Sequence, residues 1–310
     1  MKVMVAGGTG LAGSAIVRAY ERKGIQVTAI GRKTVDLLDR DATFEYVKRV
    51  KPDVIVDAAA RVGGIVANDT YPVEFLADNL RIQNNLLEAA FVADVEKFVF
   101  LGSSCIYPRD CQQPIKEEYL LTGPLEPTNS AYAIAKIAGI ELVNSFRKEY
   151  GRKWISLMPT NLYGPNDNFE LQGSHVLPAF IRRFVQAKIA DKQTEILWGT
   201  GNPTREFLHV DDLAEAVVFF QDKYDSSLHL NIGSGREISI RNLAELVAKA
   251  AQFQGKLQWD SSKPDGTPRK VLDSTKANNL GWSSQISLED GVASTIDWYV
   301  GQLENGSLRL

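Results

Sequence analysis

Gly7-Gly8-Thr9-Gly10-Leu11-Ala12-Gly13 stands between a short apolar run, residues 3–6, and a segment with apolar residues at helical spacing, residues 11–23. This order of strand, glycine turn and helix is the first half of a βαβ unit. Glycines at this spacing allow a tight turn and a close backbone approach to a pyrophosphate at a helix N-terminus. The stretch predicts a dinucleotide site that includes Gly7, Thr9, Gly10, Leu11 and Gly13.

Downstream, short β-rich runs continue to alternate with longer helical patterns. We expect strands at 25–30, 54–57, 97–101 and 154–158, and long helices at 72–93 and 131–150. Such alternation predicts an α/β fold with a Rossmann-like, doubly wound parallel sheet. The predicted binding domain for the dinucleotide covers residues 1–164.

The character of the chain changes after residue 159. Segment 163–207 is rich in Gly, Pro and Asn, which is typical of substrate-binding loops with short helices. A helix at 209–221, which His209 is expected to cap, and a strand at 228–232 predict that 208–233 returns to the main sheet. Residues 165–207 and 234–310, including a helix at 240–251, then form a smaller substrate-binding lobe at the C-terminal side.

Composition excludes several function classes. The formal net charge is −3 and 24% of residues are charged, without long runs of one sign, which argues against nucleic-acid binding and a polybasic membrane anchor. The first residues pass into glycine too soon for a signal-peptide core or a membrane span, so we expect a cytoplasmic protein. Two cysteines and three histidines lack metal-ligand spacing, so no metal is expected.

The residues after the second predicted strand indicate the nicotinamide cofactor. Gly31-Arg32-Lys33 stands where an NAD-preferring site usually carries an acidic residue for the ribose. A cation there can form a charge-assisted hydrogen bond with the 2′-phosphate of NADP. The sequence therefore favours NADP, with Arg32 reading the phosphate.

Tyr132 and Lys136 form a candidate proton-transfer pair. They are four residues apart in a predicted helix, so both side chains project from one face. An ammonium is expected to lower the pKa of a neighbouring phenol by favouring phenolate. Ser103 follows an apolar strand, residues 97–101, and completes a set that can move a hydroxyl proton while a nicotinamide transfers hydride.

Further motifs support a specific resemblance. Their residues are 62–65, 102–108, 126–129, 132–139, 158–165 and 263–270, which read VGGI, GSSCIYP, EPTN, YAIAKIAG, MPTNLYGP and KPDGTPRK. With the glycine turn, they make the whole chain resemble the extended short-chain dehydrogenase/reductase family, and among its members the GDP-sugar epimerase/reductases. The resemblance implies NADPH-dependent 3,5-epimerisation and 4-reduction of GDP-4-keto-6-deoxy-D-mannose to GDP-L-fucose.

The same resemblance implies roles for particular residues. Ser103, Tyr132 and Lys136 would orient and protonate the ketone, while Cys105 and His175 would exchange the protons at C3 and C5. Further cofactor contacts implied are Leu101, Gly102, Lys136, Pro159, Asn161, Leu162 and His175. Contacts implied to the GDP-sugar substrate are Arg183, Trp198, Arg205 and Asp265. Helices 72–93 and 131–150 would pair with their copies in a homodimer.

Other functions remain open on the residues alone. A related GDP-sugar 4-reductase would lack the epimerisation step, and a nucleotide-sugar 4-epimerase would recycle its cofactor. A 4,6-dehydratase fits less well because Cys105-Ile106 stands where that chemistry needs an acid and a base. A non-catalytic dinucleotide-sensing module would not need Ser103, Tyr132 and Lys136. The related enzymes often carry an arginine in the glycine turn, where this chain has Gly8-Thr9, so Arg32 bears more of the NADP preference.

Overall fold

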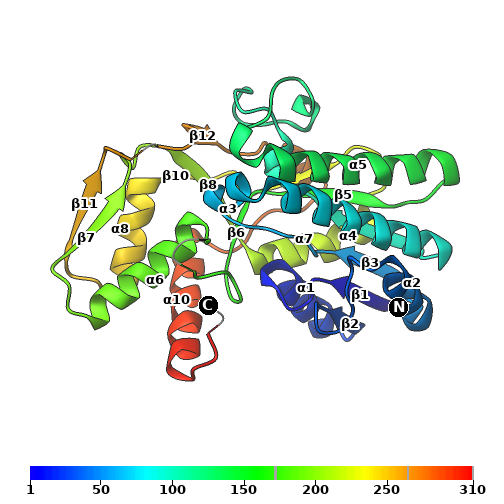
Figure 1. The fold of residues 1–310 in the computed structure, drawn as a ribbon, viewed down its shortest axis with the longest axis horizontal. Coiled ribbons are helices and arrows are strands. Elements are labelled where there is room, and N and C mark those ends of the chain that lie inside the picture. The colour runs from blue at the N-terminus through cyan, green and yellow to red at the C-terminus, as the bar shows by residue number, and fades with distance from the viewer. Residues whose placement is uncertain (171–172, 264, 309–310) are drawn as a thin grey trace.

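A six-stranded parallel sheet forms the centre of the larger lobe, in the order β2-β1-β3-β4-β5-β9 (Figure 1). The computed structural model describes residues 1–170, 173–263 and 265–308. The strands are β1 (Lys2–Ala6), β2 (Gln26–Ile30), β3 (Val54–Asp57), β4 (Lys97–Leu101), β5 (Ile155–Pro159) and β9 (Leu230–Ile232). This sheet confirms the predicted fold class.

Helices cover both faces of the sheet because its strands are apolar on both sides. Val3 and Val5 point into a core with α1 (Leu11–Arg22) and α7 (Val210–Lys223). Met4 and Ala6 point to the opposite core. That core is closed by α2 (Arg40–Val50), α4 (Pro72–Val92) and α5 (Ser130–Tyr150). Alternation along each strand thus fixes which side chains face α4 and α5.

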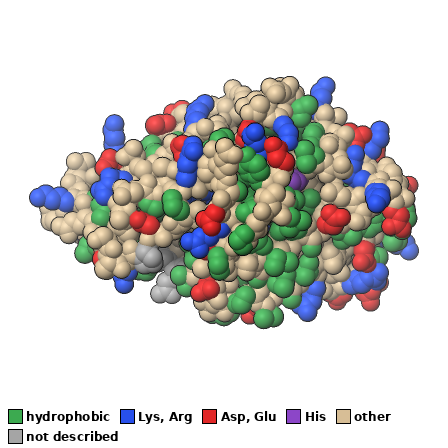
Figure 2. Space-filling model, turned by 90° about the horizontal axis from the view of Figure 1, so that it is seen from above, with side chains coloured by type: hydrophobic (Ala, Val, Ile, Leu, Met, Phe, Trp, Pro, Cys, Tyr) green, Lys and Arg blue, Asp and Glu red, His purple; other side chains and the backbone are tan. Residues whose placement is uncertain are grey.

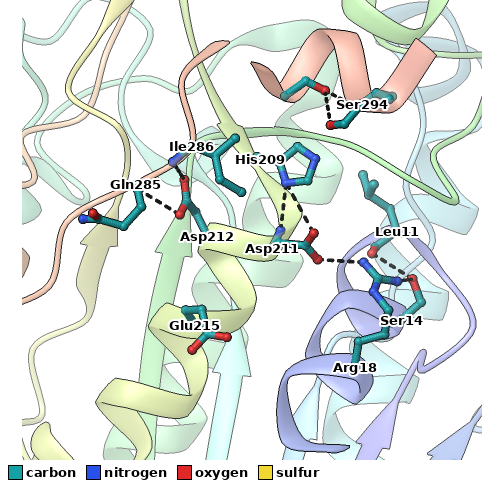
Figure 3. Close-up of polar contacts among 12 residues, drawn as sticks. Leu11, Ser14, Arg18, His209, Asp211, Asp212, Glu215, Gln285, Ile286 and Ser294 are labelled. Carbon is teal, nitrogen blue, oxygen red and sulfur yellow. Dashed lines mark hydrogen bonds and ion pairs between the residues drawn. The ribbon is translucent and has the colours of Figure 1, made fainter. Parts of the chain in front are cut away.

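The start of α7 ties distant parts of the chain together (Figure 3). His209 Nδ1 accepts a hydrogen bond from the Asp211 backbone N–H at 3.2 Å, so the predicted cap is confirmed. Asp211 pairs with Arg18 of α1 at 2.7 Å. Asp212 accepts backbone hydrogen bonds from Gln285 and Ile286, both at 3.0 Å. The joint fixes α1, which carries the glycine turn, against the C-terminal segment.

The smaller lobe lies at the other end of the molecule (Figure 1). Its core packs α6 (Val176–Ile189), α8 (Ile240–Ala250) and α10 (Leu288–Glu304) together. Two parallel strands, β7 (Thr194–Trp198) and β11 (Lys256–Asp260), flank them. The expectation of loops with short helices in segment 163–207 is wrong, because α6 has 14 residues and seven of them are buried.

Strand β8 (Thr204–His209) joins the lobes, since α7 of the large lobe follows it directly. It pairs with β6 (Asn161–Tyr163), β10 (Glu237–Ser239) and β12 (Arg269–Lys270). The remaining short elements are α3 (Ile65–Thr70), η1 (Ser104–Ile106), η2 (Glu117–Tyr119), η3 (Pro127–Asn129) and α9 (Thr275–Asn279). Within the described part of the chain, no helix is long and apolar enough to cross a membrane.

Candidate active site

The glycine turn between β1 and α1 has the tight geometry that its sequence predicts. Gly7 has φ +74°, and the Gly10 N–H donates to Gly7 O at 2.9 Å. A Cβ on Gly13 would lie 2.1 Å from Gly7 O, so a side chain there has no room. A Cβ on Gly10 would meet only Gly7 O, at 3.4 Å, so the space in front of the helix is open.

This turn fits a dinucleotide. Gly10 is the N-cap of α1 and contributes no side-chain cap, and the first helical turn carries no acidic residue. Its N–H groups are therefore available to a pyrophosphate. Thr9 lies against the end of β2, because a Cβ on Gly31 would come within 2.8 Å of its hydroxyl. Arg32 is exposed just beyond and makes no salt bridge with any described residue.

Ser103, Tyr132 and Lys136 come together at the carboxyl end of β4. Lys136 is buried on α5, and its Nζ donates to Leu101 O at 2.9 Å. The same Nζ lies 6.0 Å from the centroid of the Tyr132 ring. Ser103 caps η1 through a hydrogen bond from the Cys105 N–H at 3.3 Å, and its side chain also hydrogen-bonds Tyr132.

The expected lowering of the phenol pKa is wrong for this structure. Burial raises the pKa of Tyr132 well above its ordinary value, negative charges at Cys105 and Asp57 raise it further, and the Ser103 hydrogen bond acts against them. Burial also lowers the pKa of Lys136, which the charge of Asp57 opposes. The phenol is thus held in its protonated form, ready to donate a proton to an oxygen atom.

Cys105 opens on a small cavity and does not pack into the core. Its sulfur lies 3.5 Å from Asn129 Nδ2 and 3.6 Å from Lys270 Nζ. The cavity has a volume of about 50 Å³, and Arg109 and Glu126 are also in its lining. A thiol beside an ammonium and open to small molecules has the surroundings of a reactive cysteine.

His175 is the N-cap of α6, close to the loop that follows β3. The Gly64 N–H donates to Gly173 O at 3.1 Å, which holds that loop against the segment before α6. The imidazole keeps contact with solvent, but surrounding atoms desolvate it. Burial lowers the pKa of His175, and the positive charge of Lys270 lowers it further. Lys270 therefore lies beside Cys105 and also acts electrically on His175.

The four predicted substrate contacts lie in the smaller lobe and at its joint. Trp198 ends β7 and is 67% exposed, with Lys263 Nζ 5.6 Å from its ring centroid. Arg205 is partly buried on β8 and donates to Thr204 O at 2.7 Å, and burial lowers its pKa.

Arg183 and Asp265 are also engaged within the protein. Arg183 pairs with Glu195 at 2.7 Å, which orients its guanidinium. Asp265 accepts hydrogen bonds from Thr200 N at 2.9 Å and Oγ1 at 2.6 Å. Pro264, in the same quoted motif, lies outside the described residues.

Other predicted cofactor contacts line the ends of the central strands. Leu101 ends β4 and Gly102 follows it, and a Cβ on Gly102 would strike the Met158 side chain at 2.3 Å. Pro159 ends β5, and Leu162 of β6 pairs with Leu208 of β8. Asn161 Nδ2 donates to Glu206 O at 2.8 Å, so this amide holds β6 against β8.

Sequence reasoning gave no role to Lys270, Asn129 or Asp57. Lys270 and Asn129 stand inside the quoted motifs, but their contact with Cys105 spans 165 and 24 residues of chain. Asp57 ends an apolar strand, and a single polar residue at that place does not indicate a function. Among the described residues, no group of three or more His, Cys, Asp or Glu side chains could hold a metal ion.

Comparisons with known proteins agree with this geometry. Residues 3–233 match the NAD dependent epimerase/dehydratase family. The chain is 53% identical over 307 residues to GDP-L-fucose synthase 1 of Arabidopsis thaliana, covering 98% of this chain and 94% of that protein. It superposes with a TM-score of 0.91 on the NADP-bound GDP-L-fucose synthetase of Naegleria fowleri, at 30% identity and with 99% and 95% of the two chains covered. A GDP-6-OMe-4-keto-L-xylo-heptose reductase from C. jejuni also gives 0.91, at 33% identity and 97% and 98% coverage.

Proposed function

Because this chain belongs to the NAD-dependent epimerase/dehydratase family, and within it to the GDP-L-fucose synthases, we propose that it converts GDP-4-keto-6-deoxy-D-mannose to GDP-L-fucose by 3,5-epimerisation and NADPH-dependent 4-reduction. The observation that carries this proposal is the position of Cys105, whose thiol opens on a cavity and acts electrically on the Tyr132 phenol. A plain ketone reductase has no use for a thiol at that place.

Epimerisation uses the acidity that a ketone gives to its neighbouring carbons. Cys105 and His175 exchange the C3 and C5 protons, one side chain removing a proton and the other returning it on the opposite face. Ser103 and Tyr132 donate hydrogen bonds to the 4-oxygen and stabilise the enolate that forms. Lys270 Nζ lies 3.6 Å from the Cys105 sulfur.

Reduction then uses the same oxygen. NADPH, when bound, supplies a hydride to C4. Tyr132 donates its phenolic proton to the 4-oxygen, which becomes the hydroxyl of the product. Burial that keeps the phenol protonated suits this step.

Cofactor and substrate occupy different parts of the chain in this proposal. Residues 1–164 with 208–233 bind NADP through the glycine turn, the strand ends and Arg32. Residues 165–207 and 234–310 bind the GDP-sugar. Trp198 stacks on guanine or sugar, Asp265 accepts from guanine N–H groups, and Arg183 and Arg205 hold the diphosphate.

We extend the proposal to a cytoplasmic homodimer. Exposed apolar side chains on and before α3 to α5 support self-association; they are Val62, Ile65, Val66, Val73 and Ile134. Figure 2, viewed from the side of α5, shows hydrophobic side chains gathered on this face. A reducing compartment keeps the catalytic thiol of Cys105 free.

The test is NMR of the sugar product formed in deuterated water, with NADPH oxidation followed in parallel. We expect oxidation of NADPH and deuterium at both C3 and C5. The Cys105→Ser variant should still oxidise NADPH but give a product that is not inverted. Cys111→Ser is the matched control, because it removes the other free thiol and should keep both activities.

Two results would overturn the proposal. A wild-type protein that oxidises neither NADPH nor NADH with this substrate does not have the activity. A wild-type protein that reduces the ketone without deuterium at C3 or C5 is a GDP-sugar 4-reductase, as the C. jejuni relative is named.

A further inference from the structure

We propose that Asp57 is a positioning residue for proton transfer, acting on the phenol of Tyr132 and, as a counter-charge, on the buried ammonium of Lys136. This inference rests on the proposed function, in which the phenol donates a proton. Asp57 is not among the residues assigned above to the substrate, and its effect is transmitted through two side chains on α5, Tyr132 and Lys136.

The sheet places Asp57 behind the proton-transfer pair. It is the last residue of β3, and its Cα partners are Ala6 of β1 and Phe100 of β4. Ile55, two residues earlier, packs into the core shared with α4 and α5, as does Phe100. Since alternate residues of a strand share a face, the Asp57 carboxyl lies on the α5 side.

Lys136 enters the same space from α5. Its Nζ lies 4.8 Å from the centroid of the Phe100 ring and donates to the carbonyl of the next residue, Leu101. Both Asp57 and Lys136 are almost completely buried, at 0% and 3% exposure. A carboxylate and an ammonium thus share one dry region above the ends of neighbouring strands.

The carboxyl group keeps acceptor capacity on this side. Asp57 Oδ1 accepts from the Ala59 N–H at 3.1 Å. Oδ2 is buried and has no hydrogen-bond partner among the described residues. Burying an ionised carboxylate in this way is unfavourable unless a positive charge lies nearby, and Lys136 is the cation that acts on it.

Charged residues described on the surrounding elements have partners of their own and do not pair with Asp57 or Lys136. Glu74 and Asp78 on α4 form ion pairs with Arg61. Lys97 is at the opposite end of β4 and donates to Tyr224 O. Lys136 and Tyr132, both on α5, remain the ionisable groups coupled to Asp57.

The sign of the coupling suits a proton donor. Burial raises the pKa of Tyr132, and the charges of Cys105 and then Asp57 raise it further. Burial lowers the pKa of Lys136, and the charge of Asp57 opposes that lowering. The charge of Asp57 thus favours both groups in their protonated forms, which the reduction of a ketone requires. Burial raises the pKa of Asp57 itself to about 6, so this support is present above that pH and is lost below it.

The first experiment compares the pH dependence of NADPH-dependent reduction in wild type, Asp57→Asn and Asp53→Asn. Asp53 precedes the opposite, exposed end of β3, so its variant should match wild type. Asp57→Asn should approach wild type below pH 6 and fall behind above it, by up to about tenfold for each unit by which the Lys136 pKa drops, because the charge that supports the protonated ammonium is missing. Superimposable profiles, or an equal loss at every pH, would refute the proposal.

The second experiment needs no bound cofactor or substrate. NMR of aspartate labelled with ¹³C at the carboxyl carbon should show a signal that titrates near pH 6 and is missing in Asp57→Asn, beside that of Asp167, whose pKa burial raises to about 7. In Lys136→Met that titration should move to higher pH, because the ammonium lowers the pKa of Asp57. An unmoved titration overturns the inference, whether or not the protein reduces its expected substrate. Conversely, inactivity of the wild type overturns only the proposed function.

Discussion

Replacing Asp57 by asparagine should make the stability of the protein relative to wild type rise from acid to alkaline pH. The folded pKa of about 6 lies above the ordinary value of 3.8. The folded chain therefore binds this proton more tightly than the unfolded chain does. The carboxyl destabilises the fold increasingly as the pH rises from about 4 through 6.

The structure sets the size of this effect. A difference of about two pKa units corresponds to about 3 kcal/mol, since each unit is 1.36 kcal/mol. Of this, about 2 kcal/mol develops between about pH 4.5 and pH 8. An asparagine keeps the acceptor for the Ala59 N–H, and the cost of its buried amide is the same at every pH. Only the charge of Asp57 therefore changes the free energy of unfolding of wild type relative to the variant between the two pH values.

Thermal unfolding of wild type and variant at both pH values measures this effect. For a chain of this length, about 2 kcal/mol corresponds to about 3 °C in Tm. The Tm of Asp57→Asn relative to wild type should thus rise by about that amount from about pH 4.5 to pH 8. A gap between the two proteins that stays constant with pH would show that Asp57 does not titrate in the folded state, and the reasoning about its charge would fail.

Three further outcomes follow from the site. Tyr132→Phe should lower kcat for ketone reduction by about 10²- to 10⁴-fold, the usual contribution of a general acid, whereas NADPH affinity by fluorescence titration should change little; an unchanged kcat would show that Tyr132 is not the proton donor. Gly13→Ala should abolish NADPH binding in the same titration, because its Cβ would lie 2.1 Å from Gly7 O; normal affinity would contradict the turn geometry. Arg32→Ala should reduce the preference for NADPH over NADH in kcat/KM by about 10- to 150-fold, for a charge-assisted bond of about 1.5–3 kcal/mol; an unaltered ratio would assign the 2′-phosphate to another residue.

The large lobe could be predicted from sequence because its signals are local. Every strand of the central sheet is a short apolar run beside a glycine turn or an amphipathic helix, and the expected bounds differ from those observed by at most two residues. By contrast, α2 was not predicted, since only Thr43 and Val47 of its residues are buried. Pairing of β7 with β11 joins segments about sixty residues apart, and no local pattern encodes such a contact.

The same distinction applies to the site. Tyr132 and Lys136 are one helical turn apart, so spacing alone brings them together. The lysine beside Cys105 comes from a strand 165 residues away, and only the assembled lobes reveal it. The role of Asp57 could not be predicted for another reason. It depends on the ammonium of Lys136, which belongs to α5 and is distant from Asp57 in the sequence.

Strand β12 consists of two residues, and its alignment decides which cation meets the thiol. Lys270 stands opposite Arg205 and Arg269 opposite Thr204. A slip of one residue would turn Lys270 to the other face and present a guanidinium to the sulfur. Arg269 forms two hydrogen bonds with Glu237 of β10, at 2.7 and 2.8 Å. This ion pair helps to hold β12 in its alignment and thereby keeps Lys270 as the cation beside the Cys105 sulfur.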